Sequence, residues 1–159
     1  MPVEESGNLL ILFAAIAEME GNANFAKPYW KQLEQWAEYL KEKGFDPENQ
    51  LCTDDFAGHL AHNVNLSAKA ICGLGSFAKL CELRGDKAKA EEYFKLAREF
   101  AQRWVKEADD GEKFRLAFDK GALVEGIVSA CSRISHCQTP STVRRGRAYA
   151  NRCEGFSNL

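Results

Sequence analysis

Two stretches of the chain match without a gap, GNANFAKPYWK at residues 21–31 and GDKAKAEEYFK at residues 85–95. Both carry a glycine, a polar residue, an alanine, two aromatic residues and a lysine at the same relative positions, and Trp36-Ala37 matches Phe100-Ala101 further on. The matches begin at residues 21 and 85, so the chain contains a repeat with a period of 64 residues. A period of this kind predicts one supersecondary unit per repeat.

Each unit is predicted to be a helical hairpin. An apolar run with helical spacing precedes each glycine, over about residues 6–20 and 65–84, and an amphipathic run follows it, over about residues 22–44 and 86–107. A hairpin cannot bury its apolar faces alone, so we expect two layers with the mostly apolar helices inside. Gly73 and Gly75 indicate close approach of a neighbouring helix. The predicted fold class is all-α, with four main helices in two hairpins.

Composition and charge exclude several classes of protein. The 159 residues suit one domain, and a net charge of −2 without a basic face argues against a nucleic-acid partner. The longest apolar run, residues 9–17, is far shorter than the roughly 20 residues of a membrane span. Glu4 and Glu5 stand where a signal peptide carries positive charge, so the chain as written is expected to be cytoplasmic.

The cysteines and histidines do not form a metal-binding pattern. The six cysteines include no CxxC pair, and none has zinc-like spacing from a histidine. His59 and His62 are three residues apart and would share a helical face, but most such pairs are not ligands. We therefore predict no metal and no cofactor.

Polar segments lie at the entrances of both inner helices. One is CTDDFAGHLAHN at residues 52–63, and the other is Glu4-Glu5-Ser6. Two carboxylates close together raise one another's proton affinity, so one can act as an acid and the other as a base. Opposed carboxylates roughly 5–10 Å apart are the geometry of glycosidic-bond hydrolysis. The predicted catalytic residues are Glu4, Glu5, Asp54 and Asp55, and the predicted substrate-binding residues are Ser6, Asn8, His59, His62, Asn63 and Asp119.

Several of these residues also have a structural explanation. Acidic residues in a first helical turn are favoured by the helix dipole, which would account for Glu4, Glu5 and Asp55. Asn63 or Asn65 is expected to be the N-cap of the third helix. Asp119 follows an apolar run and fits a turn equally well. From spacing alone, catalytic and structural roles both stay open.

Residues 121–159 differ from the rest of the chain. They contain five arginines, two glutamates and no lysine, which gives a charge of +3, whereas residues 1–120 have 16 basic and 21 acidic residues, which gives −5. No helical period persists beyond Val128. We expect a helical domain over residues 1–120 and a poorly ordered tail over 121–159, with a short helix around residues 122–132.

Three strings of residues carry a family resemblance. They are MPVEESGN at residues 1–8, CTDDFAGHLAHN at 52–63 and LAFDK at 116–120, and they resemble the central helical domain of the glutaminase A-like proteins. The resemblance implies a six-hairpin glycosidase-like (α/α) toroid, of which the two hairpins would form an arc. It also implies a secreted or periplasmic multidomain hydrolase that converts glutamine to glutamate and ammonia.

The chain departs from the family at both ends of the resemblance. It opens inside the domain and leaves the family pattern after Lys120, so we expect a fragment that is inactive alone and self-associates through open hairpin faces. If Leu123-Val124-Glu125 were encoded CTG-GTC-GAG, a shift by one nucleotide would give Trp-Ser-Arg, and similar proteins continue here with a segment that contains Trp-Ser. A frameshifted tail is therefore a hypothesis that sequencing of the locus tests.

Two other functions fit part of the pattern. A six-hairpin scaffold with paired carboxylates suits a glycoside hydrolase as well as an amide hydrolase, so the small-molecule substrate is glutamine or a glycoside. A non-enzymatic helical-repeat module would share the Gly-Asp-x3-Ala-x2-Tyr-Phe pattern. That module predicts a period of about 34 residues, and it leaves the polar segment at residues 52–63 unexplained.

Overall fold

The structure is a computed structural model that describes residues 1–53, 58–111 and 113–120, all within one unit, Met1–Val128. The elements are α1 (Pro2–Glu20), the 3₁₀ helix η1 (Asn24–Tyr29), α2 (Trp30–Lys43), α3 (Val64–Arg84) and α4 (Lys87–Ala108). Within the described ranges the chain forms isolated β-bridges and no named strand. The predicted all-α class is confirmed. The predicted tail and its short helix lie outside the described residues.

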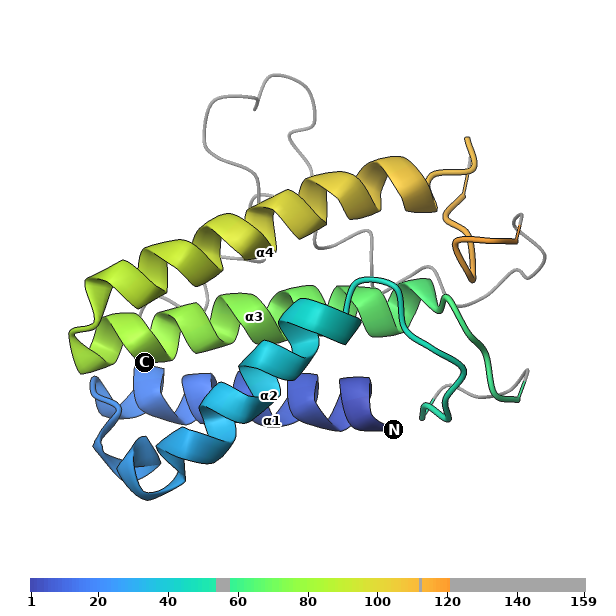
Figure 1. Ribbon diagram of the computed structural model, residues 1–159. Coiled ribbons are helices and arrows are strands. Elements are labelled where there is room, and N and C mark those ends of the chain that lie inside the picture. Colours follow the sequence, from blue (N-terminus) through green and yellow to red (C-terminus); the bar gives the residue numbers. More distant parts are fainter. Residues whose placement is uncertain (54–57, 112, 121–159) are drawn as a thin grey trace, which may run out of the picture. The chain divides into compact units, whose positions relative to one another are not determined.

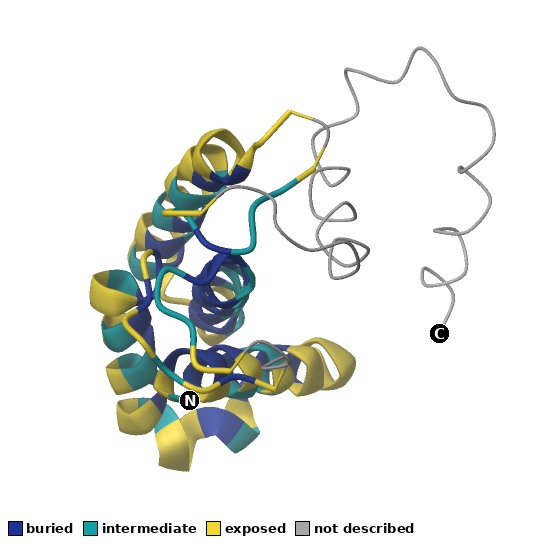
Figure 2. Cartoon of the chain, turned by 90° about the vertical axis from the view of Figure 1, so that its right-hand side faces the viewer, coloured by how far each residue is buried: buried dark blue, intermediate teal, exposed yellow. Residues whose placement is uncertain are grey.

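The helices form two layers. In Figure 1, α1 and α3 run side by side in the same direction, and α2 and α4 run in the opposite direction. Figure 2 shows buried residues where the helices face one another and exposed residues on the outer sides of α2 and α4. Each inner helix is therefore followed by an outer helix that returns antiparallel to it, as the repeat predicted.

The ends of the inner helices follow from local sequence. Gly21 and Gly85 adopt left-handed backbone conformations, with φ of 67° and 91°, which glycine reaches without steric cost. The next amides, of Asn22 and Asp86, donate to Ala17 O and Cys81 O, as in a Schellman motif. The side chain of Asp86 then caps α4 by accepting from the amide of Lys89 at 3.1 Å. Each inner helix thus ends at the glycine that follows its apolar run, as the repeat predicted.

Two element boundaries differ from the prediction, and proline accounts for both. Helix α1 begins at Pro2, not near Ser6, because proline is well suited to the first helical position. Glu4 and Glu5 consequently lie in the first turn of the helix and do not precede it. The segment after Gly21 forms η1 before α2, because Pro28 has no amide hydrogen to donate to an α-helical ladder.

The inner helices are in backbone contact at two glycines. A Cβ atom on Gly73 would lie 2.9 Å from Gly7 Cα and 2.9 Å from Leu40 Cδ1, so no larger residue fits there. A Cβ atom on Gly7 would lie 3.0 Å from Lys69 O. The close approach predicted for Gly73 is confirmed. The prediction for Gly75 is wrong, because a Cβ atom there would lie 4.0 Å from Ala97 Cβ, an ordinary contact.

The outer helices are joined by charged and polar side chains. Lys89 of α4 pairs with Glu34 of α2 at 2.5 Å, and the buried hydroxyl of Tyr93 donates to Glu38. A second ion pair joins Lys41 to Glu92 at 3.0 Å. Polar bridges thus join the outer helices, whereas the inner helices also meet backbone to backbone at Gly7 and Gly73.

One face of α1 differs from the expectation that the mostly apolar helices lie inside. Leu12, Ile16 and Met19 are 57%, 42% and 87% exposed. Leu10, Ala14 and Ala17, on the other side of the helix, belong to the core. The described helices cover α1 on one side and leave an apolar row on the other.

The glycine contact gives a direct stability test. We expect Gly73→Ala to lower the free energy of unfolding by about 1–3 kcal/mol, because the new methyl group pushes α3 away from α1. Gly75→Ala on the same helix is the matched control and should raise stability by about 0.5–1 kcal/mol. Urea unfolding measures both, and an equal response of the two variants would contradict the close contact.

Candidate functional site

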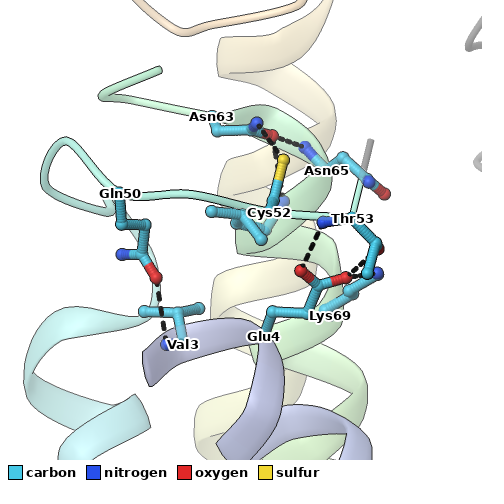
Figure 3. Close-up of polar contacts among 9 residues, drawn as sticks. Val3, Glu4, Gln50, Cys52, Thr53, Asn63, Asn65 and Lys69 are labelled. Atoms are coloured by element: carbon cyan, nitrogen blue, oxygen red, sulfur yellow. Dashed lines mark hydrogen bonds and ion pairs between the residues drawn. The ribbon is translucent and has the colours of Figure 1, made fainter. Parts of the chain in front are cut away.

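A buried carboxylate lies at the entrance of α1. Glu4 is 1% exposed, and Figure 3 shows its side chain between the loop that precedes α3 and α3 itself. Its Oε2 accepts from the Thr53 amide at 2.8 Å, and its Oε1 accepts from the Thr53 hydroxyl and from Nζ of Lys69. The carboxylate therefore joins α1, α3 and the loop in one contact.

These contacts keep Glu4 ionised. Burial raises the pKa of the Glu4 carboxyl, but the hydrogen bonds from Lys69 and Thr53 outweigh this effect and hold the pKa below its ordinary value of 4.5. A carboxylate whose oxygens already accept three hydrogen bonds is a poor proton donor at neutral pH. The geometry thus gives Glu4 a positioning role, and the catalytic role predicted for it stays a prediction.

The loop before α3 is fastened to both helix entrances. The amide of Val3 donates to Oε1 of Gln50 at 3.1 Å, and the buried Cys52 receives a hydrogen bond from Nδ2 of Asn63 at 3.7 Å (Figure 3). Gln50 also forms an antiparallel bridge with Leu60. The loop that leads into residues 54–57 is consequently held up to Thr53.

Asn63 caps α3. Its side-chain oxygen accepts from the amides of Asn65 and Leu66 at 2.9 and 3.1 Å, which confirms Asn63 as the N-cap in preference to Asn65. The residue is 5% exposed, and its amide nitrogen is directed to Cys52. Substrate binding by Asn63 stays a prediction beside this structural role.

His62 lies where two parts of the loop between α2 and α3 meet the segment after α4. Its Nδ1 is 2.7 Å from Oδ1 of Asp46, its amide donates to Pro47 O, and its carbonyl accepts from the amide of Phe118. The hydrogen bond that His62 donates to Asp46, followed by the negative charges of Asp46 and Asp119, raises the pKa of His62 above 6.5. His62 also has a positive φ of 60°, an uncommon conformation outside glycine. Asp46 therefore holds the ring through Nδ1.

The remaining predicted residues that the structure describes differ in their exposure to solvent. Ser6 is buried and Asp119 lies exposed in a turn, as its alternative explanation predicted, whereas Asp54 and Asp55 lie outside the described residues. The exposed members of the predicted set also include Glu5, Asn8 and His59.

Sequence reasoning missed three residues of this site. Lys69 carried a local signal, because a lysine between Ala68 and Ala70 in an apolar helical run needs a buried partner. Thr53 and Asp46 carried none, since their partners are distant in the chain.

The described part of the chain also bears on cofactors and membranes. Over residues 1–53, 58–111 and 113–120, no three His, Cys, Asp or Glu residues are grouped to hold a metal ion. None of the helices in those ranges combines the length and hydrophobicity needed to cross a bilayer.

Comparison with known proteins gives the family. The model of the glutaminase A six helical-hairpin domain matches residues 1–123. The chain is 35% identical over 104 residues to Glutaminase A of Aspergillus oryzae (strain ATCC 42149 / RIB 40), a match that covers 65% of this chain and 15% of that protein. It is 36% identical over 88 residues to Probable glutaminase/05536 of Arthroderma benhamiae (strain ATCC MYA-4681 / CBS 112371), covering 54% of this chain and 10% of the relative.

The chain belongs to the family defined by the glutaminase A six helical-hairpin domain. It spans less than a sixth of the length of either of these relatives. No solved structure gave a significant match.

The buried ion pair predicts a specific stability pattern. We expect Lys69→Met to cost about 3–5 kcal/mol, because it leaves the Glu4 charge buried beside neutral groups. The stability that comes from the lowered pKa of Glu4 is fully present above pH 4.5 and is lost as pH falls through the pKa of the folded state.

Urea unfolding of the unmodified chain should therefore show a loss of stability in acid that Glu4→Gln reduces. Glu5→Gln, at the exposed neighbouring carboxylate, is the control and should leave the acid slope in place. An unchanged slope in Glu4→Gln would show that Glu4 is not held as described.

Proposed function

We propose that this end of the molecule is one wall of a glutaminase pocket, in which the side-chain amide of glutamine is hydrolysed to glutamate and ammonia. The observation that supports it most is the anchoring of Thr53 on Glu4, in a chain whose relatives are named glutaminases. This contact fixes the start of the segment that carries two adjacent carboxylates, Asp54 and Asp55.

The proposed chemistry uses the carboxylates that follow Thr53. One of Asp54 and Asp55 removes a proton from water, which attacks the amide carbon. The carbon–nitrogen bond then breaks, and the other carboxyl group, whose proton affinity its neighbour raises, protonates the departing ammonia.

His62 is proposed to orient the substrate. Asp46 accepts from Nδ1 and favours the protonated ring, so Nε2–H is available to donate to a carbonyl or carboxylate oxygen. Ser6, Asn8, His59, Asn63 and Asp119 stay proposed contacts of the same pocket.

We propose further that the chain is inactive on its own. The described residues supply two hairpins, whereas the family domain is named for six. A pocket with one wall does not hold substrate and opposed groups in register. Glutamine added to the purified chain should therefore release no ammonia above the buffer rate.

The proposal is tested in a full-length relative such as Glutaminase A of Aspergillus oryzae. Replacing the residue that aligns with Asp54 by asparagine should lower kcat at least about a hundredfold with an unchanged melting temperature. Full activity on glutamine in that variant would reject the assignment. Hydrolysis of aryl glycosides in place of glutamine by the unmodified relative would support the glycoside-hydrolase alternative.

A further inference from the structure

His62 joins two distant segments through its backbone. Its amide donates to Pro47 O at 2.7 Å, and its carbonyl accepts from the amide of Phe118 at 2.9 Å. The next residue, Asn63, forms an antiparallel bridge with Ala117. The loop after α2 and the segment after α4 therefore meet at the residues that lead into α3.

The backbone conformation that makes both bonds is uncommon. His62 has a φ of 60°, in the left-handed region, where the Cβ atom crowds the backbone. A residue keeps such a conformation only when its surroundings hold it there. The ring supplies one such contact, because Nδ1 donates to Oδ1 of Asp46 at 2.7 Å, and Asp46 directly precedes Pro47. The side chain of His62 thus fastens the same segment as its amide does.

Charged groups reach the ring from both segments. Asp46 lies on one segment, and Asp119 and Lys120 lie on the other. The hydrogen bond to Asp46, with the negative charges of Asp46 and Asp119, raises the pKa of His62; loss of hydration and Lys120 oppose this rise but do not cancel it. The stability that the raised pKa gives to the folded contact is fully present below pH 6.5 and is lost as pH rises through the pKa of the folded state.

We propose that His62 and Asp46 form a pH-sensitive clasp, which fastens the segment after α4 to the loop before α3 while the ring is charged and loosens as the ring loses its proton. The neutral ring can still donate one hydrogen bond from Nδ1 but gives up the ion pair, so the left-handed backbone of His62 loses part of its support. The bond from the Phe118 amide to His62 O then opens more often. The clasp does not depend on the proposed catalysis.

An apolar contact keeps the opening local. The ring of Phe118 stacks on that of Phe45 with centroids 5.3 Å apart, and the guanidinium of Arg103 lies 3.9 Å from the ring centroid of the buried Phe45. Neither ring titrates, and an arginine stays charged over the whole pH range in which a histidine titrates. The segment therefore stays docked on Phe45 when the clasp loosens, and the response to pH is confined to the contacts at His62.

The test is hydrogen exchange of the full chain, followed by NMR from about pH 5.5 to about pH 8.5. Protection is the slowing of each amide relative to an unstructured peptide at the same pH. We expect the protection of the Phe118 amide to fall about two- to fivefold over this range, the effect of an exposed ion pair. The fall should follow the titration of the His62 ring, and its factor should equal ten raised to the shift of the His62 pKa from 6.5. The amide of Arg115, which donates to Ala108 O in the same segment, is the internal control and should keep constant protection.

Three variants separate charge from backbone conformation. Asp46→Asn keeps an oxygen that can accept from Nδ1 but removes the charge, so it should move the pKa of His62 towards 6.5 and flatten the pH dependence at Phe118. Glu91→Gln, with the same change in net charge on exposed α4, should leave that dependence in place. His62→Asn, which tolerates a left-handed backbone, should protect the Phe118 amide equally at every pH. The proposal is overturned if the protection of Phe118 in the unmodified chain is independent of pH, if Arg115 shows the same dependence, or if the dependence survives Asp46→Asn.

Discussion

The arrangement of this end of the molecule depends on the need to neutralise one buried charge. Glu4 has almost no access to water, and an ionised carboxylate in such a place is stable only when it is paired and hydrogen-bonded. Lys69 and Thr53 meet this need, and in doing so they bring α3 and the loop before it against the first turn of α1. The position of the polar loop is thus a consequence of electrostatics as well as of apolar packing.

The packing of the two hairpins explains how the loop before α3 reaches the first turn of α1. Inner helices that meet at Gly7 and Gly73 lie close enough for side chains at their entrances to reach one another. The outer helices α2 and α4 are joined to one another by ion pairs such as Lys89 with Glu34. The loop that precedes α3 then lies beside the first turn of α1, and this is where the family's pocket is proposed to lie.

Local patterns predicted the four helices and the glycines that end the inner ones, because helical periodicity and glycine after an apolar run are properties of neighbouring residues. The start of α1 at Pro2 and the 3₁₀ turn around Pro28 were missed, since both depend on how one proline fits a helix end. The ion pair of Glu4 with Lys69 joins residues 65 positions apart, and a sequence read without the fold does not specify it. The histidine at position 62 was predicted, but its partner Asp46 was not, for the same reason.

The position of the loop depends on the attachment of Thr53 to Glu4, and hydrogen exchange at the Thr53 amide measures this contact directly. We predict slow exchange of this amide near neutral pH, and fast exchange after Glu4→Ala, while the amide of Leu66 in the capped turn of α3 stays protected. Fast exchange of Thr53 in the unmodified chain, or slow exchange that survives Glu4→Ala, would contradict it.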